Sequence, residues 1–233
     1  MIYIYVNSLR MAYLQRLLKA KTLEDASLLQ RGDTIILPIL NQRERKIPLR
    51  KGKLTLSALK GYRIFMPFPY EFISEHNEVY YYLRDEKVKE RNASLTAMGM
   101  LSFLGTIPIT FHQNDFDVIG IGCCGSKITS LLQTLGCKVK MISHSRREDC
   151  ISYDHYHKIK KADIIINTAP IWLFEKDDFY DTRAIIDLSS EKCVKCAQSD
   201  VEILYPGSLP EKYFPYASAA VIYDYIMEVL NEK

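Results

Sequence analysis

Three glycines spaced as G-x-G-x-x-G carry the clearest chemical signal in this chain: Gly120, Gly122 and Gly125. An apolar run that begins at Val118 precedes them, and a helical pattern with one apolar face follows them. The bare glycine pattern is weak, but the same pattern between a strand and a helix is typical of a dinucleotide-binding site. The alternative is a glycine-rich turn that binds nothing. We favour the dinucleotide site.

Each glycine has a separate expected role. Gly120 makes the tight turn, Gly122 lets the backbone approach a pyrophosphate, and Gly125 lets the helix and strand pack closely. The free N–H groups and the positive dipole end of the helix then face the phosphates. The residues expected to hold the phosphates are Gly120, Gly122, Cys123, Cys124, Gly125 and Ser126. We expect the two cysteines to be packing residues, because the backbone matters more than the side chain at these positions.

The next expected strand ends in a sequence that bears on the choice of coenzyme: Ser143-His144-Ser145-Arg146-Arg147. NAD sites carry an acid about 20 residues past the glycines, where it binds the ribose 2′-hydroxyl. No acid stands at this strand tip, and the two arginines can donate charge-assisted bonds to a 2′-phosphate while the serines add donors. We therefore favour NADP(H), with NAD(H) left open. The alternatives are a solvated basic turn, and for His144 an adenine-packing or surface role.

Two further strand ends are expected to line the nicotinamide side of the same cleft. Asn167-Thr168-Ala169-Pro170 ends one strand, and Asp187-Leu188 ends the next. Parallel sheets bind ligands at the carboxyl ends of their strands, which is where both segments lie. Ordinary turn chemistry is the alternative, because Asn, Asp and Ser favour turns.

The elements that must position these residues form an α/β pattern. Short apolar runs alternate with helical spacing in the second half, which predicts a Rossmann-type doubly wound parallel sheet. The first half predicts a smaller N-terminal α/β domain, although residues 41–59 resist assignment. Expected strands cover 2–6, 33–38, 62–66, 79–83, 137–143, 162–168, 183–188 and 201–205. Expected helices cover 11–19, 92–106 (capped by Asn92 or Ser94) and 215–231.

These elements divide the chain into four parts. We expect a substrate-side α/β domain at 1–91, a bridging helix at 92–106, a dinucleotide-binding domain at 107–210 and a C-terminal helical segment at 211–233.

Composition narrows the function classes. The chain has 233 residues, and its net charge of +3 is too small to argue for a nucleic-acid partner. It has no apolar run near the ~20 residues of a membrane helix, and its start lacks the features of a signal peptide. We therefore expect a cytoplasmic protein whose six cysteines are reduced. Cys193 and Cys196 form one C-x-x-C pair without a partner pair, so we expect no metal site, and a redox pair is the less favoured alternative.

An ordered set of motifs resembles the dipicolinate synthase A-subunit family over most of the chain. The glycine loop is common to many dehydrogenases, whereas the N-T-x-P and P-G-x-x-P pieces are more specific. The segments that carry the resemblance are Asp33–Pro38, Asn92–Gly99, Gly120–Gly125, Ala162–Pro170, Ile185–Ser190, Tyr205–Pro210 and Pro215–Ala219.

The resemblance implies an NADP(H)-linked oxidation of dihydrodipicolinate to dipicolinate during sporulation, beside a second, flavoprotein-like subunit. It also implies two Rossmann-like domains joined by a bridging helix, with the C-terminal helix returning toward the N-terminal domain. The substrate would be a small dicarboxylate. Assembly into a homo-oligomer stays open.

The substrate half departs from the family pattern, so this chain would be a divergent member, with an N-terminal domain shorter by roughly a strand and a helix. Met98 stands where the family has Glu, and Tyr216 stands where it has Lys. These changes remove an acid/base and a cation suited to a dicarboxylate. Lys192 or Lys212 would replace that cation.

The resemblance also implies which residues face the substrate. The catalytic candidates are Ser94, Thr96 and Tyr216, and the substrate-binding candidates are Pro206, Gly207 and Ser218. Tyr216 can donate a proton or hydrogen bond; a packed tyrosine at a helix start is the alternative.

Two function classes follow. The first is an NADP(H)-dependent oxidoreductase of the dipicolinate synthase A type, and the second is a non-catalytic partner or scaffold that binds a nucleotide within such a synthase. Two-domain hydroxyacid dehydrogenases are disfavoured, because they need a late catalytic histidine and none occurs after His157.

Overall fold

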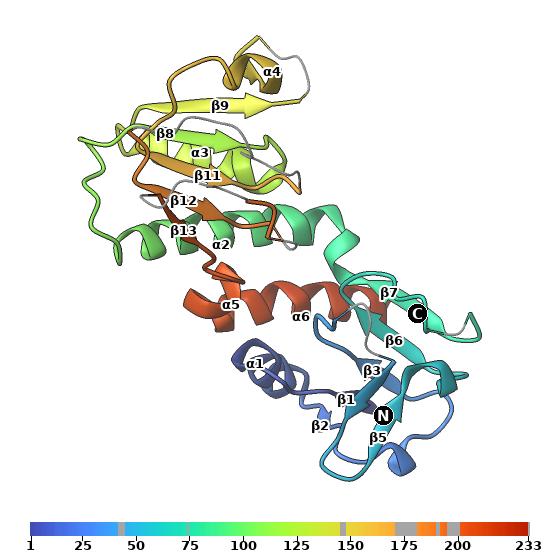
Figure 1. Cartoon of the computed structure of the whole chain (residues 1–233). Coiled ribbons are helices and arrows are strands. Elements are labelled where there is room, and N and C mark those ends of the chain that lie inside the picture. Colours follow the sequence, from blue (N-terminus) through green and yellow to red (C-terminus); the bar gives the residue numbers. More distant parts are fainter. Residues whose placement is uncertain are drawn as a thin grey trace. The chain divides into compact units, whose positions relative to one another are not determined.

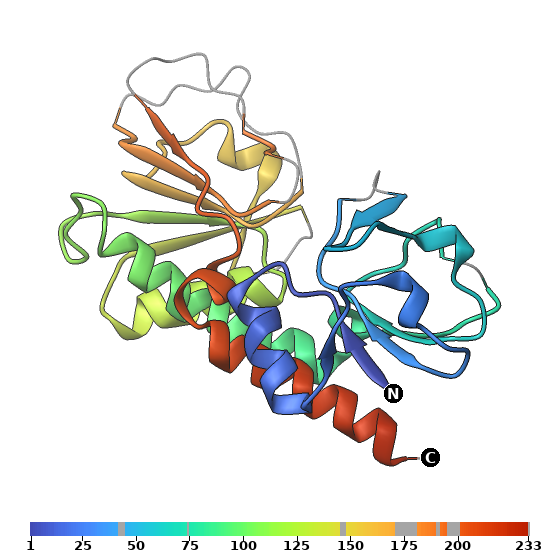
Figure 2. The same cartoon turned by 90° about the horizontal axis from the view of Figure 1, so that it is seen from below.

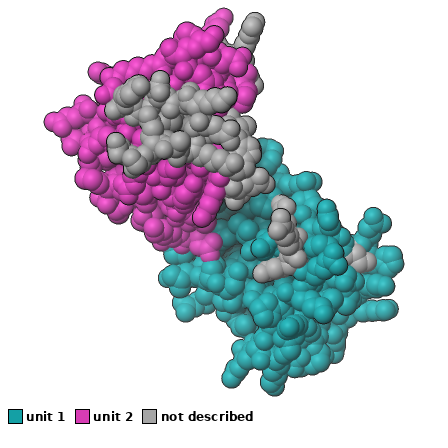
Figure 3. All heavy atoms as spheres, in the orientation of Figure 1, with its two compact units in different colours: residues 1–92, 214–233 teal, residues 93–213 magenta. Residues whose placement is uncertain are grey.

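The computed structural model describes residues 1–41, 45–73, 75–144, 148–170, 181–189, 192–194 and 201–232. The chain forms two compact units, shown in different colours in Figure 3. Unit 1 comprises residues 1–92 and 214–233, and unit 2 comprises residues 93–213. Both contain a parallel sheet and helices (Figure 1), so the predicted α/β class is confirmed.

Unit 1 is built on a five-stranded parallel sheet in the order β2-β1-β3-β6-β7. Its strands are β1 (Ile2–Ile4), β2 (Lys21–Thr22), β3 (Thr34–Ile36), β6 (Arg63–Met66) and β7 (Glu78–Tyr81). Four of the five were expected; β2 was missed because its two exposed residues show no apolar pattern.

The two faces of this sheet bury separate cores. Ile36 joins the cluster with helices α1 (Leu9–Leu18) and α6 (Pro215–Asn231), whereas its neighbour Ile35 joins the opposite cluster. This is the alternation that a strand imposes on successive side chains. The segment 41–59, unassigned from sequence, supplies the second core with a hairpin of β4 (Lys46–Pro48) and β5 (Lys53–Thr55). Each of its strands has a single buried apolar residue with exposed or half-buried neighbours, so neither forms an apolar run. Gly52, at φ +81°, makes the turn between them.

Unit 2 contains a six-stranded, all-parallel sheet in the order β10-β9-β8-β11-β12-β13. Its strands are β8 (Phe116–Ile119), β9 (Val139–Ser143), β10 (Ile151–Ser152), β11 (Ile164–Asn167), β12 (Ala184–Asp187) and β13 (Glu202–Leu204). Chain order therefore reverses between β8 and β11, as in doubly wound nucleotide-binding sheets. The four strands expected after the glycine loop are confirmed with shorter ends.

Helices pack on both faces of the unit 2 sheet. Residues of α2 (Glu86–Leu104) and α3 (Cys123–Thr134) pack on Val118, Ile164 and Ile166, with α2 running across one side of the sheet (Figure 2). The intervening Ile165 faces a second cluster that includes Tyr156 of α4 (Tyr153–Tyr156).

The helix expected at 92–106 begins six residues earlier and ends at Leu104. The carboxylate of Asp85 accepts a hydrogen bond from the Val88 N–H at 2.9 Å, which is the geometry of an N-cap. The expected caps, Asn92 and Ser94, instead lie inside the helix. The C-terminal helical segment consists of α5 (Leu209–Tyr213) and α6, and α6 spans the expected residues.

Among the described residues, no helix combines the length and apolarity that crossing a bilayer requires.

Candidate nucleotide-binding site

The glycine loop lies between β8 and α3, where the sheet order reverses. Gly120 has φ +91°, a conformation that favours glycine, and a Cβ there would lie 2.7 Å from Thr168 Oγ1. A Cβ on Gly125 would lie 1.8 Å from the Gly120 carbonyl oxygen. These two glycines therefore have the steric roles expected from the sequence, a tight turn and a close approach.

Gly122 differs from the other two, because a Cβ there would meet nothing within 4 Å. It is the N-cap of α3, which has no side-chain cap hydrogen bond and no acid in its first turn. The first intrahelical bond is the one from Ser126 N–H to the Gly122 carbonyl at 3.0 Å. The preceding N–H groups have no partner inside the helix, and such an end attracts anions.

The two cysteines after Gly122 differ in environment. Burial raises the pKa of the Cys124 thiol, and a hydrogen bond with Thr96 partly offsets that rise. Cys123 is exposed, so the expectation that both cysteines are packing residues is wrong for Cys123. Cys123 is the first residue of α3 and is not part of the buried face of that helix, to which Gly125 and Ile128 belong. Ser126 Oγ donates to the Ile121 carbonyl at 3.0 Å and so closes the loop.

The segment Asn167–Pro170 ties three strand ends together. Thr168 Oγ1 lies 3.0 Å from the Ile119 carbonyl oxygen and 3.1 Å from that of Gly120. The Asn167 amide is fully buried; its Nδ2 donates to Asp187 Oδ1 at 2.9 Å and to the Ala169 carbonyl at 3.1 Å. These bonds fix the path of the chain behind the glycine loop, while Pro170 is exposed.

Asp187 is the buried carboxylate at this edge of the sheet, with 2% of its surface exposed. Its Oδ1 accepts from Asn167 and from the Ser189 N–H at 3.0 Å. Its Oδ2 is buried and has no hydrogen-bond partner in the described part of the chain. An unpaired buried acceptor costs free energy, so this oxygen can gain from a ligand donor. The next residue, Leu188, is half-buried and donates its N–H to the Asn167 carbonyl at 2.9 Å.

At the tip of β9, Ser143 is buried and His144 is exposed. The His144 ring lies against the Tyr153 ring, with centroids 4.7 Å apart. Three of the residues that favour NADP(H), Ser145, Arg146 and Arg147, lie outside the described residues. The coenzyme preference that they suggest stays a prediction.

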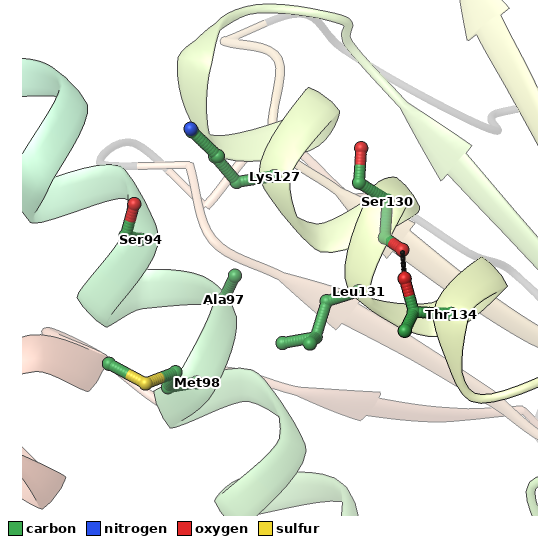
Figure 4. Close-up of a pocket in the computed structure, with 7 residues that line it drawn as sticks. All are labelled: Ser94, Ala97, Met98, Lys127, Ser130, Leu131 and Thr134. Carbon is green, nitrogen blue, oxygen red and sulfur yellow. Dashed lines mark hydrogen bonds between the residues drawn. The ribbon is translucent and has the colours of Figure 1, made fainter.

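Ser94 and Thr96, both expected at the substrate, lie on α2 but face different surroundings. Thr96 is buried, and its side chain forms a hydrogen bond with the Cys124 thiol. Ser94 lines an open pocket of about 270 Å³ between α2 and α3, shared with Met98 and Lys127 (Figure 4). Met98 is 42% exposed and offers this pocket no acid or base.

The remaining substrate candidates belong to two different units. Pro206 and Gly207 follow β13 in unit 2, where Gly207 is exposed at φ +75°. Tyr216 and Ser218 are on α6 in unit 1. Tyr216 is 56% exposed and meets the Tyr13 ring edge-on, with centroids 5.5 Å apart. Ser218 is buried, and its hydroxyl has no partner among the described residues.

The two lysines expected to replace the missing cation both lie over aromatic rings. Lys212 Nζ lies 5.3 Å from the centroid of the Tyr213 ring, and Lys192 Nζ lies 4.9 Å from that of Tyr205. Such contacts attract a cation to the ring face. Cys193 is buried, and Cys196 lies outside the described residues, so the expected redox alternative for this pair stays untested.

Two features of this edge were missed from sequence. The pairing of Asn167 with Asp187 depends on the register of β11 against β12, in which these two residues are opposite each other. The signal was present, since both residues directly end an apolar run. The contact of Tyr153 with His144 was missed because β10, which places Tyr153, has only two residues.

By sequence, the chain matches no family model and no curated protein. Its structure is similar to that of dipicolinate synthase, A chain, from Bacillus subtilis, with a TM-score of 0.80 and 17% identity, covering 99% of this chain and 95% of that one. It is also similar to the A subunit of dipicolinate synthase from Bacillus halodurans, with a TM-score of 0.79 and 16% identity, covering 98% and 97%.

A D-isomer specific 2-hydroxyacid dehydrogenase from Lactobacillus delbrueckii ssp. bulgaricus, in an NAD complexed form, has a TM-score of 0.50 and 14% identity, covering 98% of this chain and 96% of that one. At these identities the likeness establishes the fold alone. The chain therefore has the fold of the dipicolinate synthase A subunit. The resemblance predicted from its sequence motifs is confirmed at the level of the fold.

Proposed function

We propose that this chain is an NADP(H)-dependent oxidoreductase of the dipicolinate synthase A type, with its coenzyme bound in unit 2. One observation carries the proposal. The uncapped start of α3, with open space at Gly122, stands at the reversal of strand order in the sheet. Doubly wound sheets bind dinucleotides at this position.

In this proposal, each part of the dinucleotide has its own set of binding residues. Backbone N–H groups from Gly122 onward would bind the diphosphate, and the tip of β9 would hold the adenine ribose. On the other side, Thr168 to Pro170 and Asp187 would border the nicotinamide ring. Asp187 Oδ2, buried and unpaired among the described residues, would accept a hydrogen bond from the carboxamide N–H₂.

A bound nicotinamide supplies hydride transfer, and the protein supplies orientation and electrostatics. The bonds of Asn167 to Asp187 and of Thr168 to the Gly120 carbonyl hold the two sides of this site in fixed positions. Rigid positioning of this kind is what brings a substrate into a reactive geometry.

The proposed reaction is the oxidation of dihydrodipicolinate to dipicolinate. The order of the sequence motifs and the fold likeness support it. Ser94, Thr96 and Tyr216 remain the proposed catalytic side chains, with Pro206, Gly207 and Ser218 at the substrate. A flavoprotein-like second subunit is part of the same proposal.

The test is a binding titration followed by an activity assay. NADPH and NADH are titrated into the folded chain by calorimetry. In a separate assay dihydrodipicolinate and NADP⁺ are added, and the rise in absorbance is followed as NADP⁺ accepts the hydride and becomes NADPH. Binding and turnover would support the proposal. If neither coenzyme gave a binding heat with folded protein, the proposal would fail.

A second function, a non-catalytic nucleotide-binding or scaffold role, is favoured by one feature of the substrate side. Met98 stands in place of the family's acid, and both replacement lysines are engaged with aromatic rings. Tight NADPH binding, together with no formation of NADPH from NADP⁺ and dihydrodipicolinate, would select this function over the first.

A further inference from the structure

Three side chains stand in one row across the carboxyl edge of the unit 2 sheet. Asn167 is opposite Asp187 in the register of β11 and β12. In the register of β12 and β13, Ile186 is opposite Leu204, so the next residues along these strands, Asp187 and Tyr205, are neighbours. Neighbouring strands lie about 4.8 Å apart. Tyr205 is therefore the next residue beyond the Asn167–Asp187 pair, on the side away from the glycine loop.

The Tyr205 side chain is accessible and keeps its proton. About 40% of the residue is exposed. Burial of the hydroxyl, and then the negative charges of Asp187 and Cys193, raise the pKa of Tyr205 above its ordinary value, so the hydroxyl is a hydrogen-bond donor at neutral pH. In the described part of the chain it donates to the Val194 carbonyl at 3.5 Å, the outer limit of hydrogen-bond distance. A ligand acceptor could therefore take this bond.

A cation lies over the same ring. Lys192 Nζ is 4.9 Å from the centroid of the Tyr205 ring. The backbone of Lys192 has φ +52°, which is uncommon for a residue other than glycine, and such conformations cluster at functional sites. The ring face attracts the ammonium without using all three of its N–H donors. The remaining donors can bind a ligand.

A protonated hydroxyl and an ammonium on one ring suit a carboxylate. The two oxygens of a single carboxylate can accept from both donors, in charge-assisted bonds of about 2.5–2.9 Å. The ammonium is also needed for charge balance, because Asp187 beside Tyr205 would otherwise repel an anion. In the proposed function Asp187 Oδ2 accepts from the nicotinamide carboxamide, so the bound carboxylate would lie beside the reacting ring.

We propose that Tyr205 and Lys192 together bind one carboxylate of the substrate at the carboxyl edge of β12 and β13. The inference rests on the proposed function, because it requires a coenzyme in unit 2, and it deepens that function. Tyr205 was not among the residues expected at the substrate.

The position of this pair in the chain fits the other substrate candidates. Pro206 and Gly207, both proposed at the substrate, follow Tyr205 directly. The pair also selects between the two lysines expected to supply a cation, because Lys192 stands at this edge whereas Lys212 belongs to α5.

The experiment compares Tyr205→Phe and Lys192→Met with the unmodified chain. Tyr205→Phe removes the hydroxyl and keeps the ring, and Lys192→Met removes the charge and keeps most of the length. The KM for dihydrodipicolinate is measured with NADP⁺ from the formation of NADPH, and the affinity for NADP⁺ is measured by calorimetry. We expect each variant to raise KM roughly tenfold, the loss of one charge-assisted bond, with kcat and NADP⁺ affinity nearly unchanged.

A second measurement detects the same contact without turnover. Dipicolinate, the proposed product, is titrated by calorimetry into the chain saturated with NADP⁺, and we expect roughly tenfold weaker binding to each variant. If both variants bound dipicolinate as tightly as the unmodified chain, the inference would fail while the proposed function stood. It would fail in the same way if NADP⁺ bound but neither dipicolinate binding nor turnover occurred.

Lys138→Met is the matched control. Lys138 is exposed, and its carbonyl accepts from the Phe116 N–H at the amino end of the sheet, the edge opposite Tyr205. This variant should leave KM and both affinities unchanged. A rise in KM as large as that of Lys192→Met would show that net charge alone matters, and would overturn the inference.

The coenzyme measurements separate the remaining outcomes. If Tyr205→Phe weakened NADP⁺ and dipicolinate binding equally, the hydroxyl would serve the coenzyme, and the inference would be wrong. If the unmodified chain bound neither NADP(H) nor NAD(H), the proposed function itself would fail, and this inference with it.

Discussion

The Gly120 carbonyl oxygen occupies the space next to Gly125 so closely that a Cβ on Gly125 would lie 1.8 Å from it. Gly125 belongs to α3, and the Gly120 carbonyl oxygen accepts a hydrogen bond from Thr168 Oγ1, so neither residue can move without breaking other contacts. Gly125→Ala should therefore destabilise the chain by about 3 kcal/mol, the upper range for overpacking. Urea unfolding measures this; a loss below about 0.5 kcal/mol would mean that the loop adjusts freely.

Gly122→Ala, in the same loop, should have the opposite pattern of effects: little change in stability and a large loss of coenzyme affinity. Its φ of −65° suits alanine and its Cβ meets nothing, so unfolding free energy should change by less than about 1 kcal/mol. The added methyl would stand where a diphosphate approaches the start of α3, so coenzyme affinity should fall at least about tenfold. Calorimetry with NADPH checks this. Unchanged affinity would show that the diphosphate is not held there.

Gly99 lies in the middle of α2, where alanine is ordinarily better by about 1 kcal/mol. Here a Cβ would come within 2.8 Å of Leu209 Cβ and 3.1 Å of the Leu209 carbonyl oxygen. We expect Gly99→Ala to destabilise the chain by about 1–2 kcal/mol in thermal or urea unfolding.

Gly105→Ala is the control for Gly99→Ala, because a Cβ at Gly105 has its nearest neighbour at 3.6 Å, an ordinary contact. A stability gain with Gly99→Ala would show that α5 moves aside.

Asp117 is fully buried in β8, and burial raises the pKa of its carboxyl above the ordinary value. Hydrogen bonds from the Ala162 N–H and the Tyr156 hydroxyl, both at 2.8 Å, oppose that rise without cancelling it. The folded state therefore binds this proton more tightly than the unfolded state. The contribution of Asp117 to stability is highest below the ordinary carboxyl pKa and falls as the pH rises through the raised value.

Asp117→Asn removes this dependence. The free energy of unfolding of the unmodified chain minus that of Asp117→Asn should decrease as the pH rises from about 4 toward neutrality. Urea unfolding at several pH values measures the difference, and other titrating groups cancel in it. A difference that stayed constant with pH would contradict the pKa direction assigned to Asp117.

Asn167 holds two chain segments through one amide, so Asn167→Ala should cost about 1–3 kcal/mol. Asp187 Oδ2 already has no hydrogen-bond partner among the described residues. Without the Asn167 amide, the Ser189 N–H would be the one remaining donor to the Asp187 carboxylate in the described part of the chain. Thermal unfolding checks this, with the exposed Gln133→Ala as the control. Equal melting temperatures for the two variants would show that water replaces the amide at no cost.

Much of unit 2 could be read from local sequence. The glycine spacing located the loop. Apolar runs located β11 and β12, which are buried along their whole length, because a strand buried on both faces needs a continuous run of apolar side chains. Shorter apolar runs also located β9 and β13, which are only partly buried. The apolar stripe of α6 was visible for the same reason. β2, β4, β5 and β10 were missed, because each has at most one strongly apolar residue and so forms no apolar run.

The sequence by itself determined that a strand, a glycine turn and a helix follow one another. The spacing of the glycines and of the apolar residues, and the steric limits on the backbone, are properties of this one segment of the chain. Only the tertiary structure decided that Asn167 lies opposite Asp187, that Thr96 meets Cys124, and that Tyr153 lies against His144. Each of these contacts joins residues from different segments of the fold. They depend on strand register and helix packing, which the whole core selects and no single segment encodes.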